Sequence, residues 1–233
     1  MTPEKVRYHR LDNVAVITMD DGKANALSPE TIGALRNALD RAATEAAAVL
    51  LTGRERRLSG GFDLGVMTAG ADAARSLVTA GAELMLQMYM FPRPLVVGCT
   101  GHALAAGALL LLAADLRVGA AGEFKIGLNE VAIQLTLPVF AMELARDRLS
   151  KRHFTSATTQ ARIYDPQTAV DAGFLDVTAA PAELFEVALG HTRRLAGLPD
   201  PAFRHTKMRE RAATVARIRE TLAADMETLT VVS

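Results

Sequence analysis

The sequence predicts an α/β fold with an α-helical C-terminal region, on the strength of three observations. Short apolar runs typical of strands alternate with segments of helical periodicity over the first half of the chain. After Glu130 the pattern becomes mostly helical. No internal repeat, low-complexity tract or linker interrupts this order. Strands that alternate with helices favour a layered core, so we expect a core over residues 1–180 and a C-terminal helical region over 181–233.

The N-terminal part is expected to form a hairpin followed by a clearly marked helix. Strands are predicted over 6–10 and 14–19, around a turn at Leu11-Asp12-Asn13. Ser28-Pro29-Glu30 combines a capping residue, a proline and an early acid, which together mark a helix start. Apolar side chains then recur at helical spacing, at Ile32, Leu35, Leu39 and Ala42-Ala43.

The middle of the chain alternates buried strands with helices. The apolar runs Ala48–Thr52 and Pro94–Cys99 predict strands, with a helix over 73–90 between them. The next helix has no polar side chain before Asp115, so it must be buried nearly all round. The remaining predicted elements are strands over 116–120 and 123–126 and helices over 139–149, 151–158, 166–172, 181–196 and 201–227.

Composition and charge exclude several classes of function. The chain has 233 residues, half of them hydrophobic, and 26 basic side chains balance 26 acidic ones. A net charge of zero gives no electrostatic reason to expect nucleic acid or a membrane surface as a partner. The single cysteine, Cys99, excludes an intramolecular disulfide, and no cluster has the spacing of a metal site. Because there is no apolar signal region and no run of bilayer-spanning length, we expect a cytoplasmic protein.

Two stretches of small residues follow apolar runs and precede helices. The first is Leu58–Leu64 and the second is Gly101–Ala108. Glycine and alanine leave the backbone of such a turn open to a bound group. The N-terminus of the following helix adds unpaired N–H groups and the positive end of the helix dipole. Both turns are therefore candidate sites for a negatively charged oxygen.

Together, the two stretches resemble the signatures of the crotonase (enoyl-CoA hydratase/isomerase) superfamily. Ser59-Gly60-Gly61-Phe62-Asp63-Leu64 is similar to its "S-A-G-x-D-L" signature. Gly101–Arg117 is similar to the second signature, a small-residue turn and an apolar helix that ends in "D-x-R". The resemblance covers about Val6 to Glu227. It implies a crotonase-like spiral of ββα units, an acyl-CoA thioester as substrate, and no cofactor apart from the coenzyme A that the substrate carries. It also implies that the C-terminal helices assemble a homotrimer or a dimer of trimers.

The resemblance implies a chemical role for the two turns. Members of the superfamily stabilise a thioester enolate with two backbone N–H groups, and each such donor is worth roughly 3–4 kcal/mol. By position the donors here are Phe62 and Ala106, where the family usually has a small residue and a glycine. Neither difference removes an N–H group, so the expected oxyanion hole is retained.

Glu130 is the candidate base for enolate formation. It lies between apolar residues on both sides, where desolvation raises the pKa of a carboxyl group toward that of a working base. The segment Ile126-Gly127-Leu128-Asn129-Glu130 also resembles the corresponding segment of mitochondrial-type 3-enoyl-CoA to 2-enoyl-CoA isomerases.

The position of Leu109 favours the isomerase over the hydratase. A hydratase of the superfamily normally has a second glutamate on the helix after the glycine turn, and that position here is Leu109. Addition of water is well served by two carboxylates, one of which deprotonates the water while the neighbouring carbon is protonated. Moving a double bond requires a single base.

The resemblance also implies residues that bind the substrate. The candidates are Lys23, Ala24, Ala26, Ser59, Gly60, Gly61, Leu109 and Gln134. The first three match the loop that contacts coenzyme A in relatives. Gln134 stands where relatives usually have glycine, and it either projects into the acyl pocket or faces solvent. His102, in the second turn, is expected to have a structural role.

The sequence leaves two alternatives open. The first is an enoyl-CoA hydratase that works with one carboxylate. The second belongs to another class, a catalytically silent paralogue that binds acyl-CoA. The presence of Glu130 argues for chemistry and against the silent paralogue.

Overall fold

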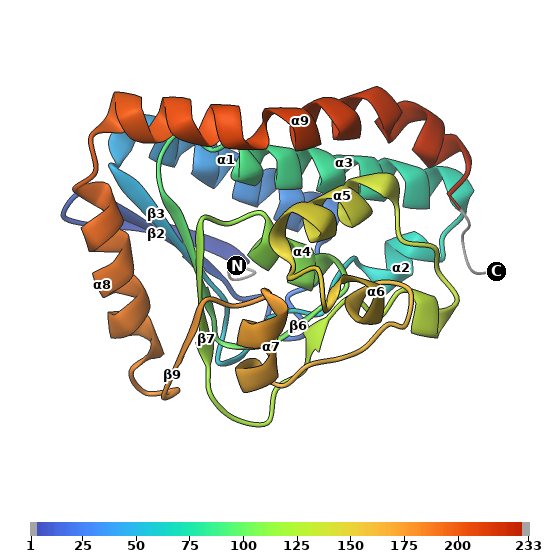
Figure 1. The fold of residues 1–233 in the computed structure, drawn as a ribbon, viewed down its shortest axis with the longest axis horizontal. Helices are drawn as coiled ribbons and strands as arrows, with labels where there is room; N and C mark the ends of the chain where they lie inside the picture. The colour runs from blue at the N-terminus through green and yellow to red at the C-terminus, as the bar shows by residue number, and fades with distance from the viewer. Residues whose placement is uncertain (1–3, 230–233) are drawn as a thin grey trace.

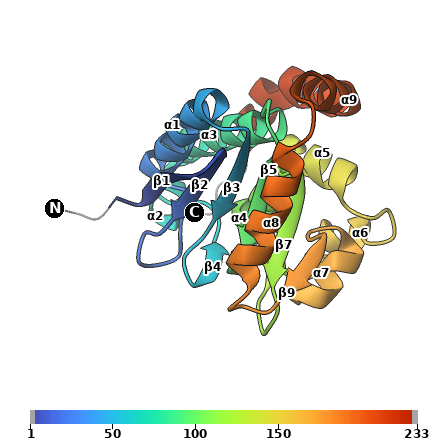
Figure 2. The ribbon, with the colours of Figure 1, turned by 90° about the vertical axis from the view of Figure 1, so that its left-hand side faces the viewer.

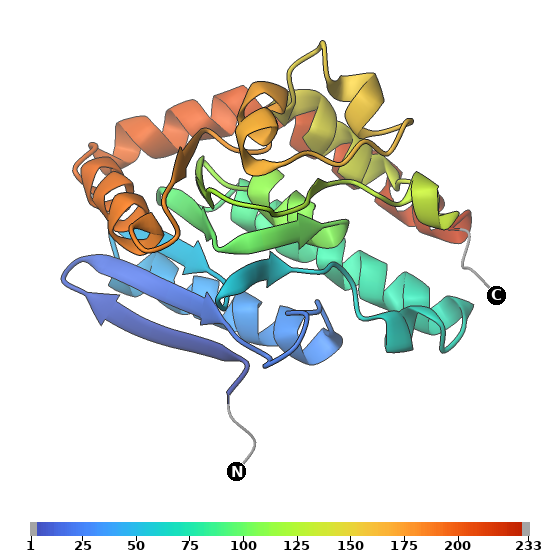
Figure 3. The ribbon, with the colours of Figure 1, turned by 90° about the horizontal axis from the view of Figure 1, so that it is seen from below.

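The computed structural model describes residues 4–229, in which the strands form two sheets. The strands are β1 (Val6–Leu11), β2 (Val14–Met19), β3 (Ala48–Thr52), β4 (Arg56–Ser59), β5 (Leu95–Cys99), β6 (Gly101–Leu104), β7 (Leu116–Ala120), β8 (Ile126–Gly127) and β9 (Val177–Ala179). The large sheet has the order β1-β2-β3-β5-β7-β9, which Figure 3 shows running from the blue hairpin to the orange strand, and the small sheet has the order β4-β6-β8. The β1–β2 pair is antiparallel and the other pairs between these strands are parallel. Residues 1–3 and 230–233, the outer ends of the two predicted regions, lie outside the described range.

Helices lie in half of the connections between consecutive strands and after the last strand. They are α1 (Pro29–Glu45), α2 (Leu64–Met67), α3 (Ala71–Tyr89), α4 (Ala106–Leu112), α5 (Val139–Arg148), α6 (Phe154–Ala157), α7 (Pro166–Ala172), α8 (Leu184–Ala196) and α9 (Asp200–Glu227), with a 3-10 turn η1 (Val131–Ile133). The predicted start of α1 is confirmed, because the Ser28 hydroxyl caps it and accepts a hydrogen bond from the Thr31 N–H at 3.2 Å. Among residues 4–229, no helix has both the length and the apolar character needed to cross a bilayer.

Three successive units repeat the same connection. In each unit one strand joins the large sheet, the next joins the small sheet, and a helix completes the turn of the chain. The units are β3, β4 and α3, then β5, β6 and α4, then β7, β8 and α5. This is the spiral of ββα units that the resemblance implied, so that prediction is confirmed.

Both faces of the large sheet are covered, which explains its apolar strands. On β2, Val14 and Val16 belong to a cluster with residues of α8, whereas Ala15 and Ile17 belong to the main core with residues of α1 and α3. Figure 2 shows α8 lying across one face of the sheet. Parallel strands that are buried on both faces carry near-continuous apolar runs, and β3 and β5 are buried along their whole length.

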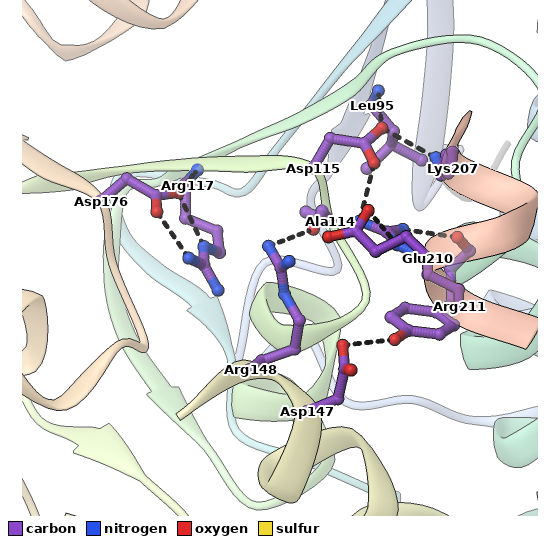
Figure 4. Close-up of polar contacts among 11 residues, drawn as sticks. Leu95, Ala114, Asp115, Arg117, Asp147, Arg148, Asp176, Lys207, Glu210 and Arg211 are labelled. Atoms are coloured by element: carbon purple, nitrogen blue, oxygen red, sulfur yellow. Dashed lines mark hydrogen bonds and ion pairs between the residues drawn. The ribbon is translucent and has the colours of Figure 1, made fainter. Parts of the chain in front are cut away.

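The long helix α9 packs across α3 and α5 (Figure 1). A buried carboxylate holds its first half, because Asp115 pairs with Lys207 at 2.8 Å and with Arg211 at 2.9 Å (Figure 4). Asp115 also accepts a hydrogen bond from the Leu95 N–H at 2.8 Å. The buried side of the second half is apolar, with Val215, Ile218 and Met226.

The structure differs from the prediction mainly in its short elements. Gly101–Leu104, predicted as part of a turn, is strand β6, and neither β4 nor β9 was predicted. Of the predicted strand over 123–126, only Ile126 lies in a strand, the two-residue β8. The predicted helix over 151–158 is shorter than expected and corresponds to α6. These segments are short and carry small or charged residues. Their strands exist because tertiary partners supply the pairing, which local patterning does not reveal.

Candidate active site

The carboxyl ends of the small-sheet strands bring three segments together. β4 leads into Gly60–Phe62, β6 leads into Ala105–Ala106, and β8 leads toward Asn129–Glu130. Because the three strands are parallel, these ends meet at one edge of the sheet, which is where open α/β sheets bind ligands. The residues that the motifs single out therefore converge from distant parts of the chain.

The first turn is held in place by the loop over residues 20–27. The Gly60 N–H donates a hydrogen bond to the Ala24 carbonyl at 2.9 Å. The Ser59 hydroxyl donates to the Asn25 carbonyl at 2.7 Å and accepts from the Gly61 N–H at 3.2 Å. Ser59 is fully buried, so its role visible in the structure is to shape the turn.

The second turn contains a backbone conformation that non-glycine residues rarely adopt. Ala105 has φ 51° and ψ −126°, and such a conformation costs of order 1–3 kcal/mol. Its N–H donates to the Gly127 carbonyl at 3.0 Å, which holds it between β6 and β8. The conformation makes Ala106 the first residue of α4, where the N–H has no acceptor within the helix.

Glycine allows the two turns to touch. A Cβ atom on Gly61, which has φ 102°, would lie 3.0 Å from the Ala105 Cβ and 3.5 Å from the Ala106 nitrogen. A Cβ atom on Gly107 would lie 2.3 Å from the Ser59 carbonyl oxygen. The first turn thus packs directly against the start of α4, and side chains at either glycine would separate them.

The N–H groups of Phe62 and Ala106 are left without a backbone partner in the described part of the chain. Within residues 4–229, no backbone carbonyl accepts a hydrogen bond from either group. Ala106 is itself buried, and buried N–H groups almost always have a partner. Two such donors on abutting turns suit an oxygen that gains negative charge.

Glu130 is a buried carboxyl group with one oxygen that has no hydrogen-bond partner among the described residues. The residue directly precedes η1. Only 8% of it is exposed, and its Oε2 atom forms no hydrogen bond with the described residues. Burial raises the pKa of Glu130 to about 7. Near neutral pH this group can therefore both take up and release a proton.

A cavity of about 270 Å³ connects Glu130 with both turns. Gly60, Phe62 and Ala105 line it on the side of the turns. Leu109 lines it as well and is only 1% exposed, so the position that would hold a second carboxylate is apolar wall. The rest of the lining is mainly apolar: Leu64, Met67, Val78, Leu104, Asn129, Ile133, Leu135, Thr136, Pro138, Phe140 and Leu229.

The predicted coenzyme A loop lies beside the first turn, outside the lining of this cavity. Lys23 is exposed, and its carbonyl accepts a hydrogen bond from Arg54 at 3.0 Å. Ala24 contacts Gly60 as described above, and the Ala26 N–H donates to the Asp21 carboxylate at 3.1 Å. The structure therefore brings this loop and the first turn together, and coenzyme A binding by Lys23, Ala24 and Ala26 stays a prediction.

Neither Gln134 nor His102 lines the cavity that contains Glu130. Gln134 is exposed, ends η1 with φ 64°, and lines a separate shallow hollow with Leu137 and Met142. His102 accepts a hydrogen bond from the Lys125 N–H at 3.0 Å through Nδ1, and its ring meets the Phe124 ring edge-on at 5.4 Å. Burial and nearby cations lower the pKa of His102. These contacts agree with a structural role for the histidine.

Two asparagines escaped the sequence analysis as separate candidates. Asn129 lines the cavity next to Glu130, and its Oδ1 atom is buried without a partner among the described residues. Asn25 is buried, and its side-chain amide donates to the Met19 carbonyl at 2.9 Å and the Leu58 carbonyl at 3.1 Å. The available signal was a polar residue set among apolar or small neighbours.

This arrangement is suited to carbanion chemistry next to a carbonyl group. A carbonyl oxygen that accepts from both free N–H groups gains stabilisation as its negative charge develops. A buried carboxylate in the same cavity is placed to move a proton on the neighbouring carbon.

Comparison with known proteins identifies similar chains. A family model described as enoyl-CoA hydratase/isomerase matches residues 9–232. An enoyl-CoA hydratase/isomerase family protein from Pseudomonas syringae superimposes with a TM-score of 0.95 at 42% identity, over 97% of this chain and 98% of that one. A protein from Mycobacterium tuberculosis, named an enoyl-CoA isomerase in one solved structure and a probable enoyl-CoA hydratase in another, superimposes with a TM-score of 0.92 in both; the first is 40% identical over 96% of this chain and 98% of that one.

A curated relative is similar over a shorter region. A probable enoyl-CoA hydratase of Bacillus subtilis is 33% identical over 132 residues, which is 55% of this chain and 50% of that protein. The match thus spans about half the length of that relative. Because the similar proteins include both a hydratase and an isomerase, similarity alone does not separate the two activities.

Proposed function

The chain belongs to the enoyl-CoA hydratase/isomerase family, which acts on acyl-CoA substrates, and from this premise we propose that it is an enoyl-CoA isomerase. The proposed reaction converts a 3-enoyl-CoA thioester to the 2-enoyl-CoA thioester. The observation that favours this reaction is the pairing of one buried carboxyl group, Glu130, with the apolar side chain of Leu109 in the same cavity.

The proposed reaction consists of two proton transfers through one intermediate. The Glu130 carboxylate takes a proton from C2 of the substrate, and the electron pair of the broken C–H bond spreads into the thioester and the C3–C4 double bond. The resulting dienolate places negative charge on the thioester oxygen, which accepts hydrogen bonds from the Phe62 and Ala106 N–H groups. Glu130 then delivers the proton to C4, which leaves the double bond between C2 and C3. The atoms of the substrate balance, and no cofactor takes part.

The state of Glu130 supports a role as base. A general base is most effective when its pKa lies near the working pH, and burial raises the pKa of Glu130 to about 7. Its Oε2 atom has no partner among the described residues that would compete for the proton. A carboxylate held by an arginine would be a weaker base, because an opposite charge lowers its pKa.

The lining of the cavity favours isomerisation over hydration. Hydration requires a water molecule that is held and deprotonated while C2 receives a proton, and two carboxylates divide this work. Among the residues of 4–229 that line the cavity, Glu130 is the one with a carboxyl group. A leucine at position 109 neither orients a water molecule nor exchanges a proton.

A hydratase is the second candidate, and one observation favours it. Asn129 also lines the cavity with a buried Oδ1 atom that lacks a partner among the described residues. An amide oxygen next to a carboxylate is able to hold a water molecule by hydrogen bonds. In that case Glu130 would deprotonate the water itself.

Two further proposals rest on the family and the composition rather than on the site. We propose that the protein forms a homotrimer or a dimer of trimers, as the resemblance implies. We also propose a cytoplasmic location. Sedimentation of the purified protein measures the first, and cell fractionation measures the second.

Parallel assays on 3-enoyl-CoA and 2-enoyl-CoA of the same chain length test the proposed function. We expect kcat/KM for isomerisation to exceed kcat/KM for hydration by a wide margin. Glu130→Gln should abolish both activities and serves as the control for contaminating enzymes. A native protein that hydrates 2-enoyl-CoA far faster than it isomerises 3-enoyl-CoA would establish the hydratase instead.

A further inference from the structure

The aromatic ring of Phe62 rests on a glycine of a neighbouring helix. A Cβ atom built on Gly81, in the middle of α3, would lie 2.3 Å from Cε1 and 2.4 Å from Cζ of Phe62. These separations are far inside van der Waals contact. The missing side chain at position 81 therefore leaves a notch in the surface of α3, and the far edge of the Phe62 ring occupies it.

The same ring also faces the cavity that contains Glu130. Phe62 lines this cavity together with Met67 and Val78, and its side chain packs against the main core. Val78 precedes Gly81 by three residues, so both lie on one face of α3. The ring thus lies along this face, between the backbone at Gly81 and the open space of the cavity.

The backbones that carry the ring and the notch are both held in place. The backbone at Phe62 forms a bridge with Leu27, and the Asp63 N–H donates to the Leu27 carbonyl at 3.2 Å. Gly81 is buried within a helix of 19 residues that packs against α1, α2, α4 and α9. A methyl group at position 81 would therefore push the ring into the cavity or displace the backbone of residue 62.

We propose that Gly81 is a positioning residue, and that its notch and the Phe62 ring together set the width of the acyl pocket. This proposal rests on the proposed function, since it assigns the acyl chain to the cavity. The ring occupies space that an acyl chain would otherwise fill, and the notch keeps the ring from taking more of it. The notch also lets the Phe62 backbone, whose N–H the proposed reaction uses, keep its contacts with Leu27.

The cost of glycine in a helix supports a specific role for the residue. Glycine in a helix interior is unfavourable compared with alanine. Gly190, within α8, provides a matched control, because a Cβ atom there has nothing within 4 Å. The same substitution should therefore have opposite effects at the two positions.

A double-mutant cycle on thermal stability tests the contact without any assay of activity. We expect Gly81→Ala to lower Tm by about 5 °C through overpacking, whereas Gly190→Ala leaves Tm unchanged or raises it. In the Phe62→Ala background the notch is vacant, so adding Gly81→Ala should raise Tm. A cycle in which Gly81→Ala has the same effect in both backgrounds would overturn the contact.

Binding and turnover test the role in the pocket. The dissociation constants of saturated acyl-CoA thioesters of increasing chain length are measured for each variant, together with isomerisation. We expect Gly81→Ala to shift the preference toward shorter chains and to lower kcat/KM by about 10- to 100-fold. Phe62→Ala should shift the preference toward longer or branched chains, and the double variant should recover most of the loss caused by Gly81→Ala.

Two results would overturn the proposal in different ways. If the Gly81→Ala variant shows the expected decrease in Tm but keeps the native chain-length preference, the notch has no role in substrate selection, although the contact with Phe62 exists. A native protein that binds no acyl-CoA would overturn the proposed function and the pocket role with it, and the Tm cycle would still decide the contact between residues 62 and 81.

Discussion

Glu130 destabilises the folded protein at the pH where the proposed reaction would use it as a base. Burial raises its pKa from 4.5 to about 7, so the native protein keeps this proton in a pH window where the unfolded chain has lost it. Because the native state binds more protons between about pH 4.5 and 7, the free energy of unfolding falls as pH rises through that window. Above pH 7 the decrease in unfolding free energy is complete and amounts to about 3 kcal/mol for a pKa shift of this size.

We predict that Glu130→Gln becomes progressively more stabilising as pH rises. The amide cannot ionise, so the difference in unfolding free energy between variant and native protein should grow by about 3 kcal/mol from pH 4.5 to pH 8. Denaturant titrations at several pH values measure it. Glu123→Gln, at an exposed glutamate, is the control and should follow the native curve. If the unfolding free energies of the native protein and Glu130→Gln vary with pH in parallel, the carboxyl group is not desolvated.

Ala106 provides a test of the second N–H donor. Proline at this position removes the N–H, whereas glycine retains it. Proline is also well tolerated at the first position of a helix, which is where Ala106 lies in α4. We predict that Ala106→Pro loses at least about 100-fold in kcat, while Ala106→Gly keeps most of its activity. Because the preceding residue, Ala105, has an unusual backbone conformation, circular dichroism must confirm that the proline variant is folded. A folded proline variant with near-native turnover would refute the assignment of this donor.

At the scale of elements, the two charged residues of the second signature anchor different parts of the chain (Figure 4). Asp115 binds Lys207 and Arg211 of α9. The Arg117 side chain donates two hydrogen bonds to Asp176, after α7, at 2.8 Å and 2.6 Å, and its backbone N–H donates a third at 2.7 Å. The residue pattern that ends the apolar helix is thus structural in this protein. These contacts join the C-terminal half of the chain to β7, the strand that follows α4.

The opposite end of α9 lies at the active-site cavity. The Asp225 carboxylate accepts a hydrogen bond from the Val139 N–H at 2.7 Å, at the start of α5. Leu229, just beyond the end of α9, lines the cavity. The position of α9 therefore affects both the fold and the boundary of the site.

We predict that Asp115→Asn strongly destabilises the protein. The change leaves buried Lys207 with no full charge opposite it and leaves buried Arg211 with only the exposed Glu210 carboxylate, at 4.0 Å; breaking a buried ion pair in this way typically costs about 3–5 kcal/mol. Asp72→Asn is the control, because Asp72 is fully exposed and pairs only with Arg75 of the same helix, at 3.5 Å. That change should alter the unfolding free energy by no more than about 0.5 kcal/mol. Equal effects at the two positions would mean that the buried cluster does not anchor α9.

At the scale of the whole molecule, the large sheet was more predictable than the small one. Ala48–Thr52 and the run before Cys99 are buried on both faces, so their apolar sequences alone indicate strands. β4, β6 and β8 are only two to four residues long, and their stability comes from one another. The sheet edge that gathers the site was therefore missed, although the paired motifs singled out Phe62 and Ala106 and the segment Ile126–Glu130 singled out Glu130.

The remaining features of the site depend on contacts between distant segments. The packing of Phe62 on Gly81 joins two elements, and no local pattern encodes it. Gln134 was a candidate for the acyl pocket, but it does not line the cavity. It ends η1 in a left-handed backbone conformation, and the next residue, Leu135, lines the cavity instead. Spacing from a motif predicts the neighbourhood of a residue better than the direction of its side chain.

The most direct test of the central claim is proton exchange at C2 of a saturated acyl-CoA in deuterium oxide. This exchange requires a base and a stabilised enolate but no double bond, so it isolates the step assigned to Glu130 and the two N–H groups. We predict measurable exchange with the native protein. Glu130→Gln should lose about a hundred- to ten-thousand-fold in exchange rate and still bind the same acyl-CoA with nearly the native dissociation constant. Exchange that persists in the folded Glu130→Gln variant would show that another group is the base, and would contradict the mechanism proposed here.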